Sequence, residues 1–173
     1  MSHDAAEARY ETVFAHLGAV TTYARRRGSS DPEGIAAEVM TIAWRRLADV
    51  PRDDPRPWLY ATARNLVWAE ARRARRAAQH GIREPEPVAG PELFELDPEL
   101  ERALRSLSAS DREALLLVAW EDLTPRQAAK ALRINPAAFR VRLLRARRRL
   151  AARLAEPPPE APAQLALVDV EGA

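Results

Sequence analysis

Apolar residues recur every three or four positions along most of this 173-residue chain, which is the spacing of one face of an α-helix. In the first half, three segments have this pattern: residues 8–26, 31–47 and 58–76. Asp31 followed by Pro32 predicts the start of the second helix, because an aspartate cap and an N1 proline both favour helix initiation. Three prolines and two aspartates within residues 50–57 predict a loop before the third helix.

The second half of the chain predicts four further helices, in residues 97–155. Asp97 and Pro98 should begin the first of them, and Ser110 with Glu113 should form a capping box at the start of the next. No segment of the chain alternates apolar and polar residues as a half-buried strand would. The sequence therefore predicts an all-α fold.

The last two predicted helices form a helix-turn-helix. Thr124, Pro125 and Gln127 combine an N-cap hydroxyl, a proline at the first helical position and a capping-box amide. Asn135 followed by Pro136 repeats the cap-and-proline signal, so the first of the two helices should end near residue 132. Two helices joined by so short a turn are typical of the helix-turn-helix motif.

Residues 79–96 separate the two halves of the chain. They contain prolines, glycines and glutamates without an apolar pattern, which is typical of a flexible acidic linker. We therefore expect two small helical domains, residues 8–78 and residues 97–155, with the helix-turn-helix in the second. The proline-rich residues 156–173 cannot continue the last helix and are expected to form a disordered tail.

The second helix of the helix-turn-helix is rich in arginine and has no acidic residue between positions 137 and 154. At about 100° per residue, its apolar side is formed by Phe139, Leu143, Ala146, Leu150 and Leu154. The opposite side, which is free to enter a DNA groove, carries Arg140, Val141, Leu144, Arg145 and Arg148. The shoulders, which are placed to meet phosphates, carry Arg142, Arg147, Arg149 and Arg153. The alternative is a surface helix that arginine merely makes soluble.

Two other helix faces carry polar residues whose role the pattern alone leaves open. In residues 58–76, the face away from the apolar stripe carries Ala61, Arg64, Asn65, Trp68 and Arg72. A tryptophan among arginines is either a platform for an unstacked base or a side chain that fills a gap between helices. In residues 31–47, a partner surface or an ordinary solvated face is formed by Glu38, Thr41, Arg45 and Arg46.

Composition narrows the classes of function. The formal net charge of +2 hides an uneven distribution, because arginine gathers in residues 64–76 and 140–153 and acidic residues gather in 84–101. The chain has no cysteine, and its three histidines are scattered. Neither a catalytic constellation, nor metal-ligand spacing, nor a glycine-rich phosphate loop is visible, so we expect no enzyme activity, no metal and no cofactor. The absence of a signal peptide or an apolar span predicts a cytoplasmic protein.

Four spaced blocks of sequence stand out: AAEVMTIAWRRL at residues 36–47, PWLYATARNLV at 57–67, LRSLSASDREALLLVAWEDLTPRQAAKAL at 104–132 and FRVRLLRARRRL at 139–150. Their order and spacing resemble the bacterial RNA polymerase sigma factors of the small, two-domain extracytoplasmic-function group. The resemblance covers about residues 10–154. It is carried by the blocks together, since each block alone is only moderately specific.

The resemblance implies a role for each of three surfaces. Contacts to the promoter's minus-thirty-five element, read as duplex DNA in the major groove, would come from Arg126, Gln127, Arg140, Val141, Leu144, Arg145 and Arg148. Contacts to a base flipped from the single-stranded non-template strand of the minus-ten element would come from Arg64, Asn65, Trp68 and Arg72. Core RNA polymerase would bind at Ala37, Glu38, Thr41 and Arg45. The family also implies an inhibitory partner, an anti-sigma factor.

A stand-alone helix-turn-helix regulator that binds duplex DNA as a dimer is the alternative function. It accounts for the arginine-rich helix at residues 139–154. It leaves the tryptophan and arginines of residues 58–76 without a role, so the sequence favours the sigma factor.

Overall fold

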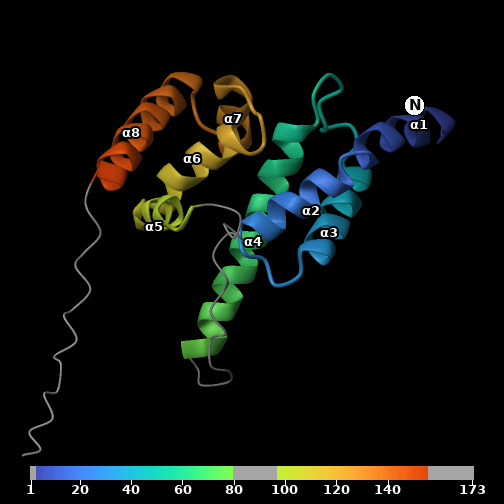
Figure 1. The fold of residues 1–173 in the computed structure, drawn as a ribbon. Coiled ribbons are helices and arrows are strands. Elements are labelled where there is room, and N and C mark those ends of the chain that lie inside the picture. Colours follow the sequence, from blue (N-terminus) through green and yellow to red (C-terminus); the bar gives the residue numbers. More distant parts are fainter. Residues whose placement is uncertain (1–2, 80–96, 156–173) are drawn as a thin grey trace, which may run out of the picture.

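The computed structural model describes residues 3–79 and 97–155, and every regular element within these ranges is an α-helix (Figure 1). This confirms the predicted all-α class. The helices are α1 (His3–Phe14), α2 (Leu17–Arg26), α3 (Pro32–Arg45), α4 (Arg56–Gln79), α5 (Pro98–Ser106), α6 (Ala109–Ala119), α7 (Pro125–Leu132) and α8 (Pro136–Ala155). We call α1–α4 the N-terminal unit and α5–α8 the C-terminal unit. Apart from Gln79, which ends α4, the predicted linker and tail lie outside the described residues.

The N-terminal unit begins with two helices where the sequence predicted one. α1 ends at Phe14 and α2 begins at Leu17. His16 precedes α2 without a side-chain cap, and Gly18, which has a low helix propensity, lies just after the break. Both helices pack on α3. The apolar spacing correctly predicted that this segment packs on the core, where Val13 and Val20 are buried, although Phe14 stays 47% exposed. The prediction of one continuous helix was wrong.

The starts of α3 and α4 follow from the local sequence. The Asp31 carboxylate accepts a hydrogen bond from the Gly34 N–H at 2.9 Å, which confirms the predicted cap. α4 begins at Arg56, two residues earlier than predicted and inside the expected loop. Ala61 was expected on the outward face of this helix and is instead buried. The reason is that α4 packs against α7 of the C-terminal unit as well as against α2 and α3, so its outward face is partly covered.

Caps also define the helix-turn-helix. Thr124 and Gln127 form the predicted capping box, with the Thr124 N–H donating to the Gln127 carbonyl oxygen at 2.8 Å. The Asn135 side chain accepts from the Ala137 N–H at 2.7 Å at the start of α8. Between the helices, Arg133 adopts the left-handed conformation (φ 54°), and its N–H donates to carbonyl oxygens at the end of α7. That conformation costs a non-glycine residue about 1–2 kcal/mol, which the hydrogen bonds of the turn help to offset.

The predicted cap of α6 was wrong. Ser108, rather than Ser110, is the N-cap, and its hydroxyl accepts from the Asp111 N–H at 3.2 Å. Glu113, which was assigned to a capping box with Ser110, is buried and bonds to residues of the N-terminal unit instead. Ser108 precedes Asp111 by three positions, and Ser110 precedes Glu113 by three positions. The local sequence pattern therefore did not distinguish the two serines.

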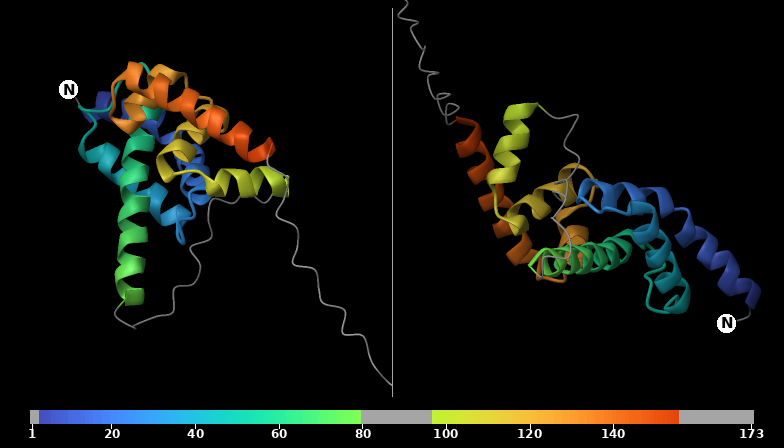
Figure 2. Two further views of the ribbon diagram at one scale, coloured as in Figure 1. Left: turned by 90° about the vertical axis from the view of Figure 1, so that its left-hand side faces the viewer. Right: turned by 90° about the horizontal axis from the view of Figure 1, so that it is seen from below.

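The two units share one hydrophobic core. α4 is the central element, because it contacts α2 and α3 on one side and α7 on the other (Figures 1 and 2). Fully buried side chains lie in both units, among them Tyr23 and Leu59 in the first and Leu117 and Phe139 in the second. The boundary predicted from the sequence is thus a surface across which helices pack.

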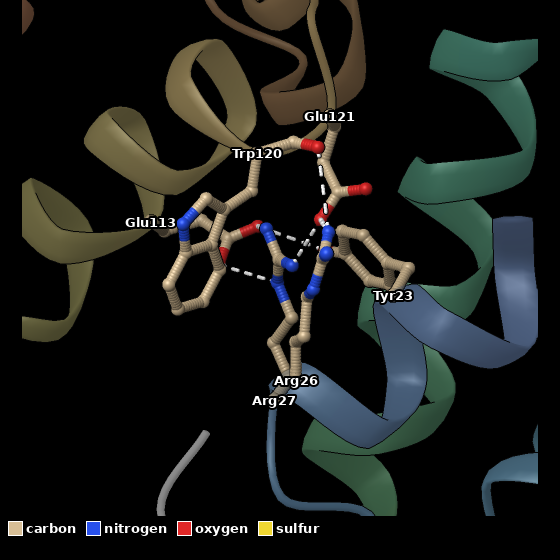
Figure 3. A network of polar contacts seen from close by, with 6 residues as sticks. All are labelled: Tyr23, Arg26, Arg27, Glu113, Trp120 and Glu121. Carbon is tan, nitrogen blue, oxygen red and sulfur yellow. Dashed lines mark hydrogen bonds and ion pairs between the residues drawn. The ribbon is translucent and has the colours of Figure 1, made fainter. Parts of the chain in front are cut away.

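A buried group of polar side chains crosses this surface (Figure 3). Arg27 follows the last residue of α2 and donates to Glu113 of α6 (Nε to Oε2, 3.2 Å) and to Glu121 beyond α6 (Nη1 to Oε1, 2.6 Å). The Tyr23 hydroxyl donates to Glu113 at 2.8 Å. The Arg27, Glu113 and Glu121 side chains are 9%, 10% and 4% exposed, so these ion pairs are largely excluded from water. We call Tyr23, Arg27, Glu113 and Glu121 the interunit network.

Two arginines at the end of α2 lie over aromatic rings. The Arg27 guanidinium lies 3.8 Å from the Tyr23 ring centroid, and that of Arg26 lies 5.2 Å from the Trp120 centroid. Burial and the Glu113 charge raise the pKa of Tyr23 well above its usual value. Burial alone lowers the pKa of Arg27, but the neighbouring Glu113, Tyr23 and Glu121 outweigh it and raise the pKa. Arg27 therefore stays charged and Tyr23 stays neutral across the physiological pH range.

Identical substitutions at a buried and an exposed leucine should show how much the shared core contributes. Leu117 in α6 is fully buried, so Leu117→Ala is expected to lower the free energy of unfolding by about 2–5 kcal/mol. Leu144 in α8 is 50% exposed, and the same change there should alter it by less than about 0.5 kcal/mol. Urea denaturation followed by circular dichroism measures the free energy of unfolding of both variants. Equal losses would contradict the burial of Leu117 and the exposure of Leu144.

Candidate nucleic-acid interface

α8 presents to solvent the side that the sequence assigned to DNA. Its inward side is anchored by Phe139, Leu143 and Ala146, all buried. The residues of the opposite side are all exposed: Arg140, Val141, Leu144, Arg145 and Arg148. This confirms the predicted orientation of the helix. Towards its C-terminus the inward side loses its cover, since Leu150 is half-buried and Leu154 is exposed.

The exposed side of α8 combines two kinds of contact. Val141 and Leu144 are 47% and 50% exposed and lie among three exposed arginines. In a major groove, arginine donates two hydrogen bonds to guanine or binds phosphate, and apolar side chains contact the methyl group of thymine. The exposed side of α8 therefore carries both residue types that a DNA-reading helix uses.

The arginines on the shoulders of α8 differ in their surroundings. Arg149 forms an ion pair with Asp111 of α6, inside the C-terminal unit. Arg142 is half-buried and lies close enough to the N-terminal unit to act on Arg64 of α4. Burial and the Arg142 charge together lower the pKa of Arg64. Arg149 is thus held by the protein itself, whereas Arg142 is half-buried near a second cation.

In α7, the two residues expected to contact DNA differ in their exposure to solvent. Arg126 is exposed. Gln127 is half-buried, since its carbonyl oxygen belongs to the capping box and its amide nitrogen donates to Asp54 Oδ2 at 2.5 Å. Asp54 lies in the loop before α4, so a predicted DNA contact is bonded to the N-terminal unit. No local pattern in the sequence indicates this bond, because its two residues are 73 positions apart.

On α4, Arg64 and Trp68 form a stacked pair. The Arg64 guanidinium lies 3.5 Å from the Trp68 ring centroid, and its Nε is buried without a hydrogen-bond partner. Trp68 is 44% exposed, so it does not fill a gap between helices. Asn65 and Arg72 are also exposed on this part of the helix. An indole backed by a cation, with amide and guanidinium groups nearby, is suited to stacking on an unpaired base.

Glu70 holds this part of α4 in place. Its carboxylate accepts from the Ser29 hydroxyl at 2.8 Å and from the Ser30 N–H at 2.9 Å. The Ser30 hydroxyl donates to the same carboxylate. These bonds tie the turn between α2 and α3 to α4, two residues beyond Trp68. Serines in a turn carry no periodic signal, so the apolar pattern of the sequence does not indicate these bonds.

The four residues proposed to bind polymerase share one exposed face of α3: Ala37, Glu38, Thr41 and Arg45. The Thr41 hydroxyl donates to the Ala37 carbonyl oxygen at 2.9 Å, and so remains on the helix surface. Beside this face, Trp44 packs edge-on against Tyr10 of α1 at 5.0 Å between ring centroids. Trp44 and Phe14 are 41% and 47% exposed. This aromatic cluster of Tyr10, Phe14 and Trp44 extends the exposed surface beside the α3 face.

Other kinds of site are not evident in the described ranges. No three His, Asp or Glu side chains of residues 3–79 and 97–155 come together as metal ligands would. Among the helices of those same ranges, none has the length and apolar character needed to cross a bilayer.

Comparison with known proteins gives the C-terminal unit a family. Residues 98–150 match the family described as Sigma-70, region 4. These residues run from the start of α5 almost to the end of α8 and include the complete helix-turn-helix. No curated protein matches the sequence significantly.

Solved structures resemble most of the chain. The sigma factor RpoE from Bartonella quintana, solved with the anti-sigma factor NepR, is 24% identical, with a TM-score of 0.63 over 83% of this chain and 94% of that one. CnrH, solved with the cytosolic domain of CnrY, is 26% identical, with a TM-score of 0.57 over 83% and 85%. The PhyRSL–NepR complex from Sphingomonas sp. Fr1 is 22% identical, with a TM-score of 0.57 over 87% of this chain and 93% of that one. Together with the match of residues 98–150, these findings confirm the family resemblance drawn from the sequence.

Proposed function

We propose that this chain, a member of the sigma factors with a sigma-70 region 4 domain at residues 98–150, binds core RNA polymerase and directs it to specific promoters. The observation that carries this proposal is the exposed arginine and aliphatic side of α8 within that domain. A stand-alone helix-turn-helix regulator would need the C-terminal unit alone. The fold similarity extends over 83% of the chain and supports a function that uses both units.

The two units would divide the promoter between them. We assign residues 97–155 to the minus-thirty-five element, residues 8–78 to the minus-ten element and to polymerase, and residues 79–96 to the connection. In the first assignment, α8 enters the major groove with Arg140, Val141, Leu144, Arg145 and Arg148. A well-placed arginine on guanine contributes about 1–3 kcal/mol of discrimination, so a few such contacts are enough to select a sequence.

At the minus-ten element, α4 would take up a base from the non-template strand. Removing a base from the duplex costs a few kcal/mol. Stacking on an aromatic ring returns about 1–3 kcal/mol per base. Trp68 offers the ring and Arg64 a cation behind it, while Asn65 and Arg72 are exposed on the same part of the helix. This chemistry uses binding free energy and needs no catalytic group.

Two protein partners follow from the same reading. Core RNA polymerase would bind the exposed α3 face of Ala37, Glu38, Thr41 and Arg45, and this places the activity in the cytoplasm with the polymerase. An anti-sigma factor is the second partner. The RpoE structure, which supports this, was solved with the anti-sigma factor NepR.

Run-off transcription with purified core polymerase and a library of promoter fragments tests the proposed function. The chain is expected to produce transcripts of defined length from a subset of fragments that share two sequence elements. Core polymerase alone is the control and should leave these fragments silent. The absence of any defined transcript, combined with tight binding of the isolated chain to a palindromic duplex, would favour the stand-alone regulator.

Two substitutions on different units should separate the two binding activities. Arg145→Ala is expected to weaken promoter binding by about 1–3 kcal/mol and to leave association with core polymerase unchanged, because α8 faces DNA. Glu38→Arg should weaken association with core polymerase and leave the DNA-facing side of α8 intact, because it reverses a charge on the α3 face. Arg102→Ala, an exposed arginine of α5, controls for loss of charge. Pull-down and promoter gel-shift assays measure both activities, and loss of polymerase binding in Arg145→Ala would mean that the surfaces are misassigned.

Replacement of Trp68 should affect strand opening more than duplex binding. Trp68→Ala removes the stacking surface, so thymines of the minus-ten region should react less with permanganate in the polymerase complex. Trp68→Phe keeps an aromatic face and should retain part of this reactivity. If Trp68→Ala opened the promoter as well as the unaltered chain does, the tryptophan would have no part in capturing the strand.

A further inference from the structure

The C-terminal part of α4 extends beyond the helices that pack around its first part (Figures 1 and 2). Val67 is buried, and no described side chain that follows it on α4 is. Three residues beyond Val67, the Glu70 carboxylate accepts hydrogen bonds from Ser29 and Ser30 in the turn between α2 and α3. These bonds hold the helix to the N-terminal unit at the point where it leaves the core. We call the residues that follow, 71–76, the arginine arm.

Arginine predominates in the arginine arm, and its arginines share one side of the helix. They are all exposed: Arg72, Arg73, Arg75 and Arg76. The sequence has no acidic residue from position 71 to position 79. At about 100° per residue, the arginines lie on the side of α4 that carries Asn65 and Trp68, whereas Glu70 lies on the opposite side. The arm therefore continues the surface that we propose captures the minus-ten strand.

The helix dipole alone does not explain this cluster. Its attraction for cations is limited to the last turn of a helix, and of the arm's arginines only Arg76 lies in the last turn of α4. Arginines three or four positions apart, such as Arg72 and Arg76, repel each other on a helix surface. Bound phosphates would relieve this repulsion, so the arm is suited to a polyanion as its partner.

The position of the arm along the chain indicates which part of the DNA it would meet. From Trp68 to Arg75 the helix rises about 10 Å, which is the rise of about three base pairs of B-DNA. The chain continues from the end of α4 through residues 80–96 to the C-terminal unit. The arm thus belongs to the part of the chain that leads from the minus-ten surface to the minus-thirty-five surface. Its DNA partner is therefore expected between the two elements.

We propose that the arginine arm binds the sugar–phosphate backbone of the duplex next to the minus-ten element, on the side of the minus-thirty-five element. This inference rests on the proposed function and adds a DNA contact outside both elements. Guanidinium contacts to phosphate position a protein on DNA without reading its sequence, so the arm adds affinity to every promoter that α4 and α8 select. Glu70 fixes the direction of the arm, because its bonds to Ser29 and Ser30 restrain the helix immediately before the arm begins.

Replacement of two arm arginines tests for phosphate contacts. Arg73→Gln combined with Arg75→Gln removes two exposed charges, neither of which is assigned to the minus-ten element. Each phosphate contact contributes about 0.9 to the slope of log affinity against log salt. The slope for the polymerase complex on a promoter found by run-off transcription should therefore fall by about 1.8. Raising the salt from 50 to 200 mM should then weaken the unaltered complex about 10-fold more than the variant complex.

A matched variant controls for the loss of two charges. Arg102→Gln combined with Arg105→Gln removes two exposed arginines from one helix, α5, in the C-terminal unit. Because α5 is not proposed to contact DNA, the salt dependence of this variant should equal that of the unaltered chain. Circular dichroism checks that both double variants are as helical as the unaltered chain, as expected for changes at exposed positions.

Uncharged DNA identifies the phosphates that the arm contacts. Methylphosphonate groups, which carry no charge, would replace the phosphates of the first four base pairs on the minus-thirty-five side of the minus-ten element. On this fragment the unaltered chain and the variant with Arg73→Gln and Arg75→Gln should bind with the same salt dependence. A fragment with the same number of methylphosphonates midway between the elements is the control, and on it the two chains should differ as they do on native DNA.

Each of three results would overturn the inference while the proposed function still stands. Equal slopes on native DNA would mean that the arm contacts no phosphate. An undiminished difference between the two chains on the neutral fragment would place the contact elsewhere on the DNA. Loss of association with core polymerase in a pull-down without DNA would make the polymerase the partner of the arm. Failure of run-off transcription would instead refute the proposed function, and this inference with it.

Discussion

A guanidinium can be buried only where carboxylates and hydrogen-bond acceptors are buried with it. For Arg27 this condition links the two units, because its partners Glu113 and Glu121 belong to the C-terminal unit. The end of α2, the middle of α6 and the segment before α7 must therefore meet at one point (Figure 3). Once they do, α4 packs on α7 and the hydrophobic core becomes continuous across the two units. The position of every proposed binding surface relative to the others follows from this contact.

Local features of the fold were predictable because their causes are local. Asp31, Asp97, Thr124 with Gln127, and Asn135 each cap a helix through bonds to residues at most three positions away, and the sequence shows both partners side by side. The prediction of Ser110 as the cap of α6 was wrong, because Ser108 fits the same local pattern and is the actual cap. The orientation of α8 was also predictable, since its apolar and arginine sides differ so clearly.

Residues of the candidate site whose environment depends on the other unit were beyond sequence reasoning. The bond from Gln127 to Asp54 and the ion pairs of Arg27 join positions 73 to 94 apart, and no periodicity marks such pairs. Glu113 and Glu121 look like surface residues in the sequence, because an isolated glutamate is rarely buried. The roles of the three surfaces came from the family resemblance, while the exposure of α3, α4 and α8 gives those roles a physical basis.

Two exposed tryptophans lie at two different proposed binding surfaces of the molecule. Trp44 adjoins the α3 face, and Trp68 stands on α4 with Arg64 stacked against it. Indole fluorescence responds to the removal of water and to contact with a nucleobase. The chain has four tryptophans, so a version that keeps only Trp44 or only Trp68 would carry one optical reporter at one proposed surface, and stopped-flow fluorescence could then time contact at that surface without attached dyes.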